Sequence, residues 1–339
     1  MDNEITKISL VHRSETRRKA CNGCCDAKRR CDLILPSCGR CMTKRMKCVY
    51  VCQNLHITEA EADNMSVRRA SNERLTTCNG LHFSLKLLQP GYLTKQQMNY
   101  MVAQFRGFIK SIVSEGETPF IHRLYQDTMP DIYQDALSIC SLYVQKTPRN
   151  QGAIFRMLDS KLDTLLRISD SARVEDNLLS LQCLILYQII RLLDGDAQQR
   201  INAERHLELL DLWTLRLQQN YFQAISSTRV GYDNWVLIES IRRTTMVSVI
   251  LRASYFAMRD GYCELVDLLS TLSVSTRSSR VWKMEDEWEE GKSTSEVLTY
   301  AEFTNEWNKG RVDGIEEYEK LLLVACRYAK VAGKFDPSA

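Results

Sequence analysis

The sequence contains little of what enzymes commonly use for catalysis. Its 14 glycines form no phosphate-binding loop, and the Gly-x-Ser-x-Gly motif of serine hydrolases is absent. The chain has five histidines, and no two of them have the spacing of a metal-binding pair: His12, His56, His82, His122 and His206. We therefore predict that the protein is not an enzyme.

Long apolar runs are missing as well. The most apolar stretch, residues 178–193, is interrupted by polar side chains such as Gln182 and Arg191. It falls short of the roughly 20 residues that a membrane span needs, so we interpret it as a buried core helix and predict no membrane partner. Residues 1–20 carry charged side chains and no apolar core, so we expect no secretory signal.

Charge is divided unevenly along the chain. The first 50 residues contain 12 Lys and Arg against 5 Asp and Glu, a net charge of +7. The other 289 residues contain 33 against 37, a net charge of −4. A small basic head on a larger, mildly acidic body indicates an anionic partner for the head, and nucleic acid is the first candidate.

Cysteine is concentrated in the same head, where eight of the 13 cysteines lie in the first 52 residues. Without a secretory signal, such a cluster indicates metal ligands rather than disulfides. Six of these cysteines form the pattern Cys-x2-Cys-x6-Cys twice, in residues 21–31 and 38–48. Cys25 and Cys52 lie outside the pattern, and we interpret them as spectator thiols.

The repeat offers three thiolates per unit, whereas a structural zinc ion takes four ligands. Two zinc ions need eight contacts, which six cysteines supply when two of them bridge both ions. By the symmetry of the repeat, the first cysteine of each unit is expected to bridge, namely Cys21 and Cys38. The predicted cofactor is two zinc ions per chain, and the predicted ligands are Cys21, Cys24, Cys31, Cys38, Cys41 and Cys48.

The spacing of these cysteines resembles that of the fungal binuclear zinc cluster transcription factors, in which six cysteines hold two zinc ions. The resemblance covers roughly residues 17–50, and Ala20, Pro36 and Tyr50 also agree with it. The segment Cys-x3-Lys-x-Arg-Cys in residues 24–31 is closer to the aflatoxin-regulator type, which is found with fungal secondary-metabolite gene clusters.

A weaker resemblance covers roughly residues 95–290 and concerns the all-helical regulatory region of short fungal cluster regulators. It rests on phrases such as TPFIH at residues 118–122, LQCLILYQIIRLLDGD at residues 181–196 and ESIRRTTM at residues 239–246.

The family resemblance implies that the short helix after the second cysteine enters the major groove of DNA. The family's reading lysine falls on Lys28, which is then expected to read a CGG- or TCG-like half-site. Cys25 and Ala27 stand where members often have basic residues. The predicted DNA-binding residues are Lys28, Arg29, Arg30, Arg40, Lys44, Arg45, Lys47, Arg17, Arg18 and Lys19. The run from Arg17 to Lys19 is either a nuclear-import signal, an arm that contacts phosphate, or a solvated charge run.

Apolar residues spaced by three and four predict helices in the rest of the chain. These stripes span residues 98–112, 155–166, 207–217, 235–249 and 315–328. The predicted fold is mostly α, with a zinc-cluster DNA-binding head at residues 17–50, a linker at 51–80 and an all-α regulatory domain at 81–335. The linker shows no heptad repeat, so any contact between two copies is expected to come from the helical body or to form only on DNA.

Two groupings in the body have structural and functional interpretations. Glu239 has Arg242 and Arg243 at helical spacing, which favours an ion pair that holds the fold over a catalytic role. Residues 281–290 mix two tryptophans with five acidic residues. This composition suits an activation surface, but packing of the two tryptophans is the favoured interpretation.

Together these features predict a sequence-specific DNA-binding transcription regulator located in the nucleus, belonging to a fungal secondary-metabolite gene cluster. Its expected partners are double-stranded promoter DNA, a second copy of itself on DNA, and the transcription machinery. The alternative is a zinc-dependent module that binds protein or RNA, attached to a helical body that senses a ligand.

Overall fold

The computed structural model divides the chain into two compact units, which we call the head and the body. The head comprises residues 1–32 and 38–81, and the body comprises residues 33–37 and 82–339. The structure describes residues 20–32, 38–46, 48, 93–126, 129–168, 173–225, 231–276, 278–283, 285–288, 297–311 and 315–325. The predicted linker therefore lies outside the described residues, as do Arg17, Arg18, Lys19 and Lys47.

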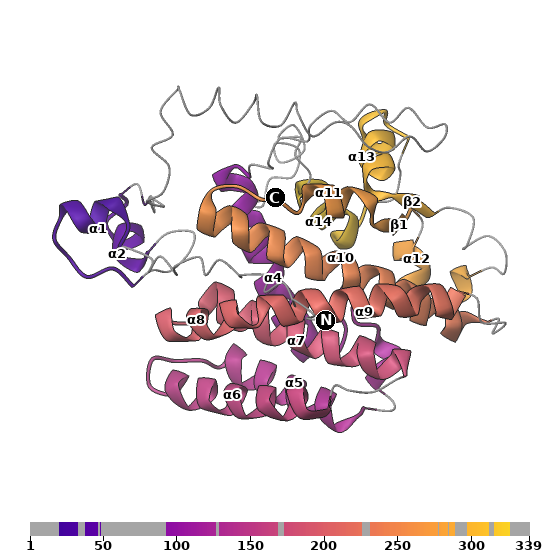
Figure 1. The fold of residues 1–339 in the computed structure, drawn as a ribbon, viewed down its shortest axis with the longest axis horizontal. Helices are drawn as coiled ribbons and strands as arrows, with labels where there is room; N and C mark the ends of the chain where they lie inside the picture. The colour runs from indigo at the N-terminus through magenta and orange to yellow at the C-terminus, as the bar shows by residue number, and fades with distance from the viewer. Residues whose placement is uncertain are drawn as a thin grey trace, which may run out of the picture. The chain divides into compact units, whose positions relative to one another are not determined.

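Two short helices form the described part of the head, α1 (Asn22–Asp26) and α2 (Gly39–Thr43). Figure 1 shows them at the indigo end of the chain. Each helix begins directly after a cysteine in extended conformation, Cys21 for α1 and Cys38 for α2. The first cysteine of each repeat unit therefore starts a helix, and the repeat in the sequence is also a repeat in the structure.

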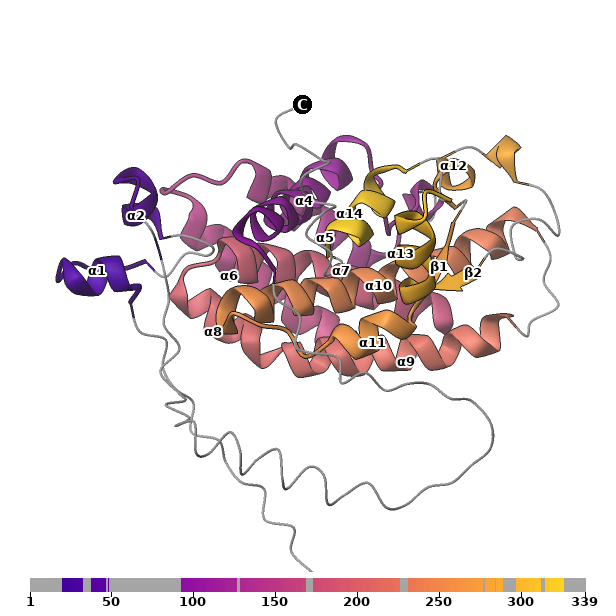
Figure 2. The same ribbon diagram turned by 90° about the horizontal axis from the view of Figure 1, so that it is seen from above.

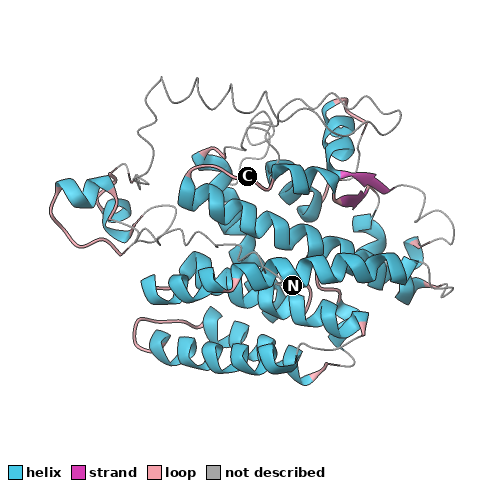
Figure 3. Cartoon of the chain, viewed as in Figure 1, coloured by secondary structure: helices cyan, strands magenta, loops and turns pink. Residues whose placement is uncertain are grey.

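The described part of the body is a stack of helices with one small pair of strands, as predicted for an all-α domain (Figure 3). Its α-helices are α4 (Lys95–Ser114), α5 (Asp131–Val144), α6 (Gln151–Ile168), α7 (Val174–Asp194), α8 (Ala197–Arg205), α9 (Leu207–Ile225), α10 (Tyr232–Asp260), α11 (Val266–Thr271), α12 (Ser278–Lys283), α13 (Tyr300–Asn308) and α14 (Glu317–Ala325). Short 3-10 turns occupy η1 (Arg123–Gln126) and η2 (Glu285–Glu287). Strands β1 (Ser273–Ser275) and β2 (Val297–Thr299) pair antiparallel, with Val274 opposite Leu298.

The centre of the body is α7, which contacts α4, α5, α6, α8, α9 and α10. Every residue from 177 to 193 on this helix is buried. By length and composition α7 could cross a membrane, but 94% of its most apolar window is buried inside the body, as in a core helix. The prediction of a core helix at residues 178–193 is confirmed.

The apolar stripes predicted from sequence lie on the inner faces of α4, α6, α9, α10 and α14. Proline and glycine residues stand at several of the helix ends. Pro130 precedes the first turn of α5, Gly195 follows the last turn of α7, and Gly231 precedes α10. The end of the last stripe, at Tyr328, lies outside the described residues.

Candidate metal centre and nucleic-acid interface

Six cysteine thiols meet at the centre of the head. They come from the two cysteine repeats, residues 21–31 and 38–48. Cys21, Cys24, Cys38 and Cys41 are fully buried, and Cys31 and Cys48 are partly buried. The thiols fall into two groups of four, each able to hold a metal ion: Cys21, Cys24, Cys31 and Cys38 in one, and Cys21, Cys38, Cys41 and Cys48 in the other. The two groups share Cys21 and Cys38.

The sulfur-to-sulfur distances match a tetrahedral metal site. The Sγ atoms of Cys21 and Cys38 lie 3.7 Å apart, and Cys21–Cys41 and Cys24–Cys38 lie 3.6 Å apart. A zinc–sulfur bond of about 2.3 Å gives a tetrahedron with edges of about 3.8 Å. A disulfide would need an S–S distance of about 2.05 Å. The thiols are therefore arranged around central positions and are not bonded in pairs.

Backbone N–H groups donate to two of the six thiols. The backbone N–H of Cys41 donates to the Sγ of Cys38 at 3.4 Å, and the N–H of Cys38 donates to the Sγ of Cys48 at 3.3 Å. Burial raises the pKa of the Cys21 thiol to about 11 and also raises the pKa of the Cys41 thiol. The pKa values of these thiols stay raised despite the described donors, so a bound cation is what would deprotonate the cluster.

Both units of the head end their helix in the same unusual backbone conformation. Lys28 and Arg45 each lie four residues after the second cysteine of their unit, and both have positive φ, 49° and 50°. The following N–H turns back in both cases: Arg29 donates to the carbonyl of Cys24, and Met46 donates to that of Cys41, each at 2.9 Å. This left-handed turn closes the helix and lifts a basic residue away from the cysteines.

The described basic side chains lie mostly on the outside of the head. Lys28, Arg29, Arg30, Lys44 and Arg45 are exposed, as a contact with DNA would require. Arg40 is different, because it is half-buried. Its Nη1 donates to the carbonyl of Gly23 at 3.1 Å and lies 3.9 Å from the Sγ of Cys24. Arg40 therefore joins the two units of the head.

Sequence reasoning missed a second tie between the units. The N–H of Gly39, in the first turn of α2, donates to Oδ2 of Asp32 at 2.9 Å. A Cβ on Gly39 would lie 2.7 Å from that same oxygen, so a side chain there would displace the Asp32 carboxylate and weaken this hydrogen bond. Asp32 directly follows the third cysteine and Gly39 the fourth, but Val49 and Asn22 stand at the equivalent positions of the repeat, so the repeat gave no signal for this contact.

The body contains a buried polar network that joins two of the quoted phrases. Arg243 in ESIRRTTM donates from Nε to Glu239 Oε1 at 2.9 Å and from Nη1 to the carbonyl of Pro119 in TPFIH at 2.9 Å. Arg242 Nη1 lies 3.3 Å from the other oxygen of Glu239. The predicted ion pair is confirmed with both arginines.

The same guanidinium reaches the last helices of the body. Nη2 of Arg243 donates to the hydroxyl of Ser278 at 2.8 Å. The guanidinium lies 4.3 Å from the ring centre of Trp282 and 4.4 Å from that of Tyr318. Arg243 therefore holds α10, α12 and α14 together.

The two tryptophans of the acidic segment pack against the body. Trp282 on α12 is 3% exposed, and Trp288 packs against the cluster that contains Tyr232 and Trp235. The packing interpretation of these residues therefore agrees with the structure, although the two tryptophans do not share one helix.

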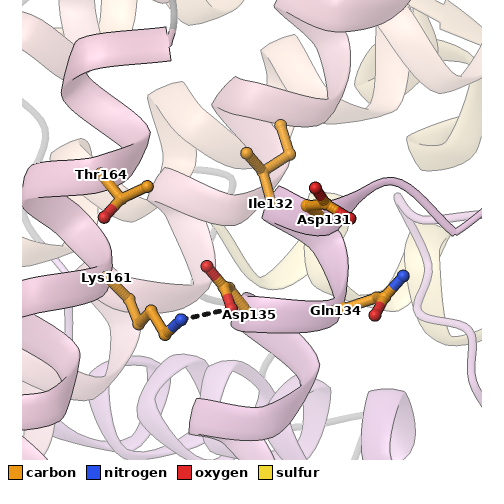
Figure 4. A pocket seen from close by; sticks show the side chains of 6 residues that line it. All are labelled: Asp131, Ile132, Gln134, Asp135, Lys161 and Thr164. Carbon is orange, nitrogen blue, oxygen red and sulfur yellow. Dashed lines mark ion pairs between the residues drawn. The ribbon is translucent and has the colours of Figure 1, made fainter.

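A surface pocket of about 370 Å³ lies between α5 and α6 (Figure 4). Its lining residues are Asp131, Ile132, Gln134, Asp135, Lys161 and Thr164. The Nζ of Lys161 lies 2.6 Å from a carboxylate oxygen of Asp135, so the two charges in the middle of the pocket are already paired. The pocket therefore has no set of side chains with a specific chemical task.

Comparison with known proteins gives a match along nearly the whole chain. Neither a family model nor a solved structure matches the chain. The sequence is 28% identical to the transcription factor gsfR2 of Penicillium aethiopicum, over 94% of this chain and 94% of the relative's length. The match therefore includes the helical body as well as the head. The resemblance stated from sequence is confirmed: this chain is a homologue of a fungal transcription factor, and its N-terminal cysteine cluster fits a zinc cluster.

Proposed function

We propose that the protein is a sequence-specific DNA-binding regulator whose head is held together by two zinc ions. The observation that carries the proposal is the pair of four-thiol groups that share Cys21 and Cys38. The name of the relative supports the assignment of this chain as a transcription regulator. A protein with that role is not expected to be an enzyme. Two zinc ions, DNA sequence preference and a nuclear location are the finer parts of the proposal.

The metal has a structural role in this proposal. Each four-thiol group would hold one zinc ion, and the two shared thiolates would bridge the ions. Two zinc ions and six thiolates carry a net charge of −2, which Lys28, Arg29 and the neighbouring basic residues outweigh. The head can then approach the phosphates of DNA.

The division of work between the basic residues follows from their positions. Lys28 follows the C-terminal end of α1 and is exposed, so it is proposed to read guanine in the major groove of a CGG- or TCG-like half-site. Arg29, Arg30, Lys44 and Arg45 are proposed to contact phosphate, which fixes the register without reading bases. Arg40 contributes to this interface by joining the two units rather than by reaching outward.

The genes regulated are proposed to belong to a secondary-metabolite cluster, with promoter DNA and the transcription machinery as partners. This finer assignment rests on the cysteine and basic pattern at residues 24–31 and on the body phrases.

The deciding experiment is selection of binding sites from a random DNA pool by the zinc-loaded full chain. Enrichment of sites with CGG- or TCG-like triplets supports the proposal. A Lys28→Ala variant, which keeps the cysteines, should enrich no common triplet. If the wild-type chain enriches no sequence but retains a protein or an RNA, the head is an interaction module and the proposal is wrong.

A further inference from the structure

Two hydrogen bonds connect the two halves of the head in addition to the shared thiols. Arg40 on α2 donates from Nη1 to the carbonyl of Gly23 on α1 at 3.1 Å. The N–H of Gly39 on α2 donates to Oδ2 of Asp32, which directly follows the first repeat, at 2.9 Å. We call these two hydrogen bonds the ties of the head. Figure 2 shows α1 and α2, the helices that the first tie connects, in indigo.

The first tie joins equivalent positions of the two repeats. Gly23 and Arg40 each lie two residues after the first cysteine of their repeat. Gly23 offers only its backbone, whereas Arg40 supplies a long side chain that is half-buried. Nη1 of Arg40 also lies 3.9 Å from the Sγ of Cys24, on the same helix as Gly23. The guanidinium therefore holds the beginning of α1 next to α2.

The second tie acts at the N-terminus of α2. Residues that precede a helix often cap it with a side-chain oxygen, but here that position is occupied by Cys38, whose thiol belongs to the cluster. Asp32 instead supplies a carboxylate oxygen to the first N–H of the helix. Val49 stands at the equivalent position of the other repeat and has no acceptor in its side chain, so the two ties differ in kind.

The thiols fix the positions of their sulfur atoms more tightly than the angle between the two helices. Each sulfur is joined to the backbone through single bonds that can rotate, so the same cluster is compatible with several tilts of α1 against α2. This tilt sets where Lys28, which follows α1, lies relative to Arg45, which follows α2. Side chains that must reach defined atoms of a ligand need a second layer of contacts that holds their own elements in place.

We propose that Arg40 and Asp32 are positioning residues. Through the two ties they fix the tilt of α1 against α2, so that Lys28 meets guanine while Arg45 meets phosphate. The inference rests on the proposed function and deepens it, because it names residues that set base preference through another residue. A phosphate contact would behave differently, since it strengthens binding to all sequences alike.

The first test compares Arg40→Met with Arg45→Met in the zinc-loaded full chain. Both are measured on the duplex that the wild type selects and on a scrambled duplex, at several salt concentrations. Arg40→Met should lower the preference for the selected duplex about tenfold and leave the salt slope unchanged, because Lys28 is displaced from its base. Arg45→Met should keep the preference and lower the slope by about 1. An Arg40→Met chain that keeps its preference and loses slope would make Arg40 a phosphate contact and overturn the proposal.

The second test compares Asp32→Asn with Asp32→Ala. Both variants lose the negative charge, but only asparagine keeps a side-chain oxygen that can accept from the N–H of Gly39. Asp32→Asn should therefore keep the base preference of the wild type, whereas Asp32→Ala should lower it about fivefold, as expected for one lost hydrogen bond. Both variants should bind every duplex more tightly, since a charge that repels phosphate is gone, so the readout is preference and not affinity. Equal preference in the two variants contradicts a role for the second tie.

The third test needs no DNA and uses amide hydrogen exchange of the zinc-loaded full chain. Arg40→Met should speed exchange in residues 22–31 about tenfold at an unchanged zinc content, whereas Arg45→Met should not. Unchanged exchange in Arg40→Met overturns the first tie, and loss of zinc from this variant would make Arg40 a support of the metal site instead. A wild-type chain without base preference would overturn the proposed function, and the exchange measurement would then still decide whether Arg40 holds α1.

Discussion

Lys28 and Arg45 occupy equivalent positions in the two units of the head, and both have a left-handed backbone, with φ of 49° and 50°. Non-glycine residues rarely adopt this conformation, because Cβ crowds the following carbonyl. Both turns are held by the hydrogen bonds that close α1 and α2. The same left-handed turn thus places a cationic side chain at the surface in both repeats. Only the side chain of Lys28 is proposed to read bases.

This equivalence leads to a prediction for DNA recognition. Lys28→Ala should flatten the base preference by about 1–3 kcal/mol of discrimination. Arg45→Ala should weaken binding to all sequences alike and lower the slope of affinity against salt by about 1. Binding assays on matched and scrambled duplexes at several salt concentrations measure both effects.

Lys28→Gly is the control for the backbone. Glycine accepts positive φ without strain, so this variant keeps the turn and removes only the side chain. It should lose base preference as Lys28→Ala does. A Lys28→Gly protein that still prefers one triplet would show that the turn, and not the ammonium group, sets the specificity.

Removal of metal should unfold the head. The described core of the head consists mainly of cysteines, so in the proposed two-zinc arrangement the metal supplies the folding energy, on the order of 10 kcal/mol per ion. A chelator should release two zinc ions per chain and abolish DNA binding, as elemental analysis and gel shifts will show.

Single cysteine substitutions test the sharing of ligands. Cys21→Ser or Cys38→Ser should release both ions, because each of these thiols belongs to both groups. Cys25→Ser should release neither, since Cys25 is exposed and lies outside both groups. A measured content of one zinc per chain in the wild type would contradict the shared-thiolate arrangement.

Arg243 should be a major source of stability in the body. Arg243→Met should destabilise the body by about 3–5 kcal/mol, because Glu239, which is 1% exposed, would lose its closest partner. Denaturant unfolding followed by circular dichroism measures the change. Arg173→Met is the matched control, since the Arg173–Asp176 pair lies at the surface and should change stability by less than about 1 kcal/mol.

Gly195 should not tolerate a side chain, even though its φ of −73° is open to any residue. A Cβ there would lie 2.3 Å from the carbonyl oxygen of Arg191 and 2.8 Å from the Cβ of Gln199. Gly195→Ala should therefore destabilise the body by about 1–3 kcal/mol.

Gly107 on α4 is the comparison, because a Cβ there meets nothing within 4 Å. Gly107→Ala should stabilise the body by about 0.5–1 kcal/mol, and equal losses from both substitutions would contradict the steric argument.

His122 should make the body sensitive to acid. Its ring is buried, its Nε2–H donates to the carbonyl of Trp282 at 2.8 Å, and its Nδ1 accepts from the N–H of Leu124 at 3.2 Å. Burial lowers its pKa from 6.5 to about 4, helped by the charges of Arg123 and Arg243 and opposed by the bond to Trp282.

The lowered pKa of His122 sets the direction of the pH effect. Well above pH 6.5 the histidine is neutral in both the folded and the unfolded chain, and it contributes no pH dependence. As the pH falls from 6.5 towards 4, the unfolded chain takes up a proton that the folded chain refuses. This uptake should reduce stability by at most about 1.4 kcal/mol per pH unit. His122→Gln should lower stability at neutral pH and give a flatter profile below pH 6.5, and an unchanged slope would contradict the assignment.

The spacing of residues was enough to predict the helices and the metal site, because both depend on local geometry. A stripe of apolar residues at intervals of three and four packs on one side wherever α6 or α9 lies in the fold. Likewise, the two cysteine repeats contain all the thiols of the cluster, and the need for four ligands per zinc, together with the symmetry of the repeat, is enough to predict Cys21 and Cys38 as the shared pair.

Only the tertiary structure decided which residues meet across long stretches of chain. Arg243 and Pro119 are far apart in sequence, and nothing in their spacing shows that the guanidinium donates to that carbonyl. The burial of one face of α9 against α7 and α10 likewise determined that Leu212 and Leu215 stay at the surface. Helix periodicity identifies an apolar residue, but the packing of the neighbouring helices decides whether that residue is covered.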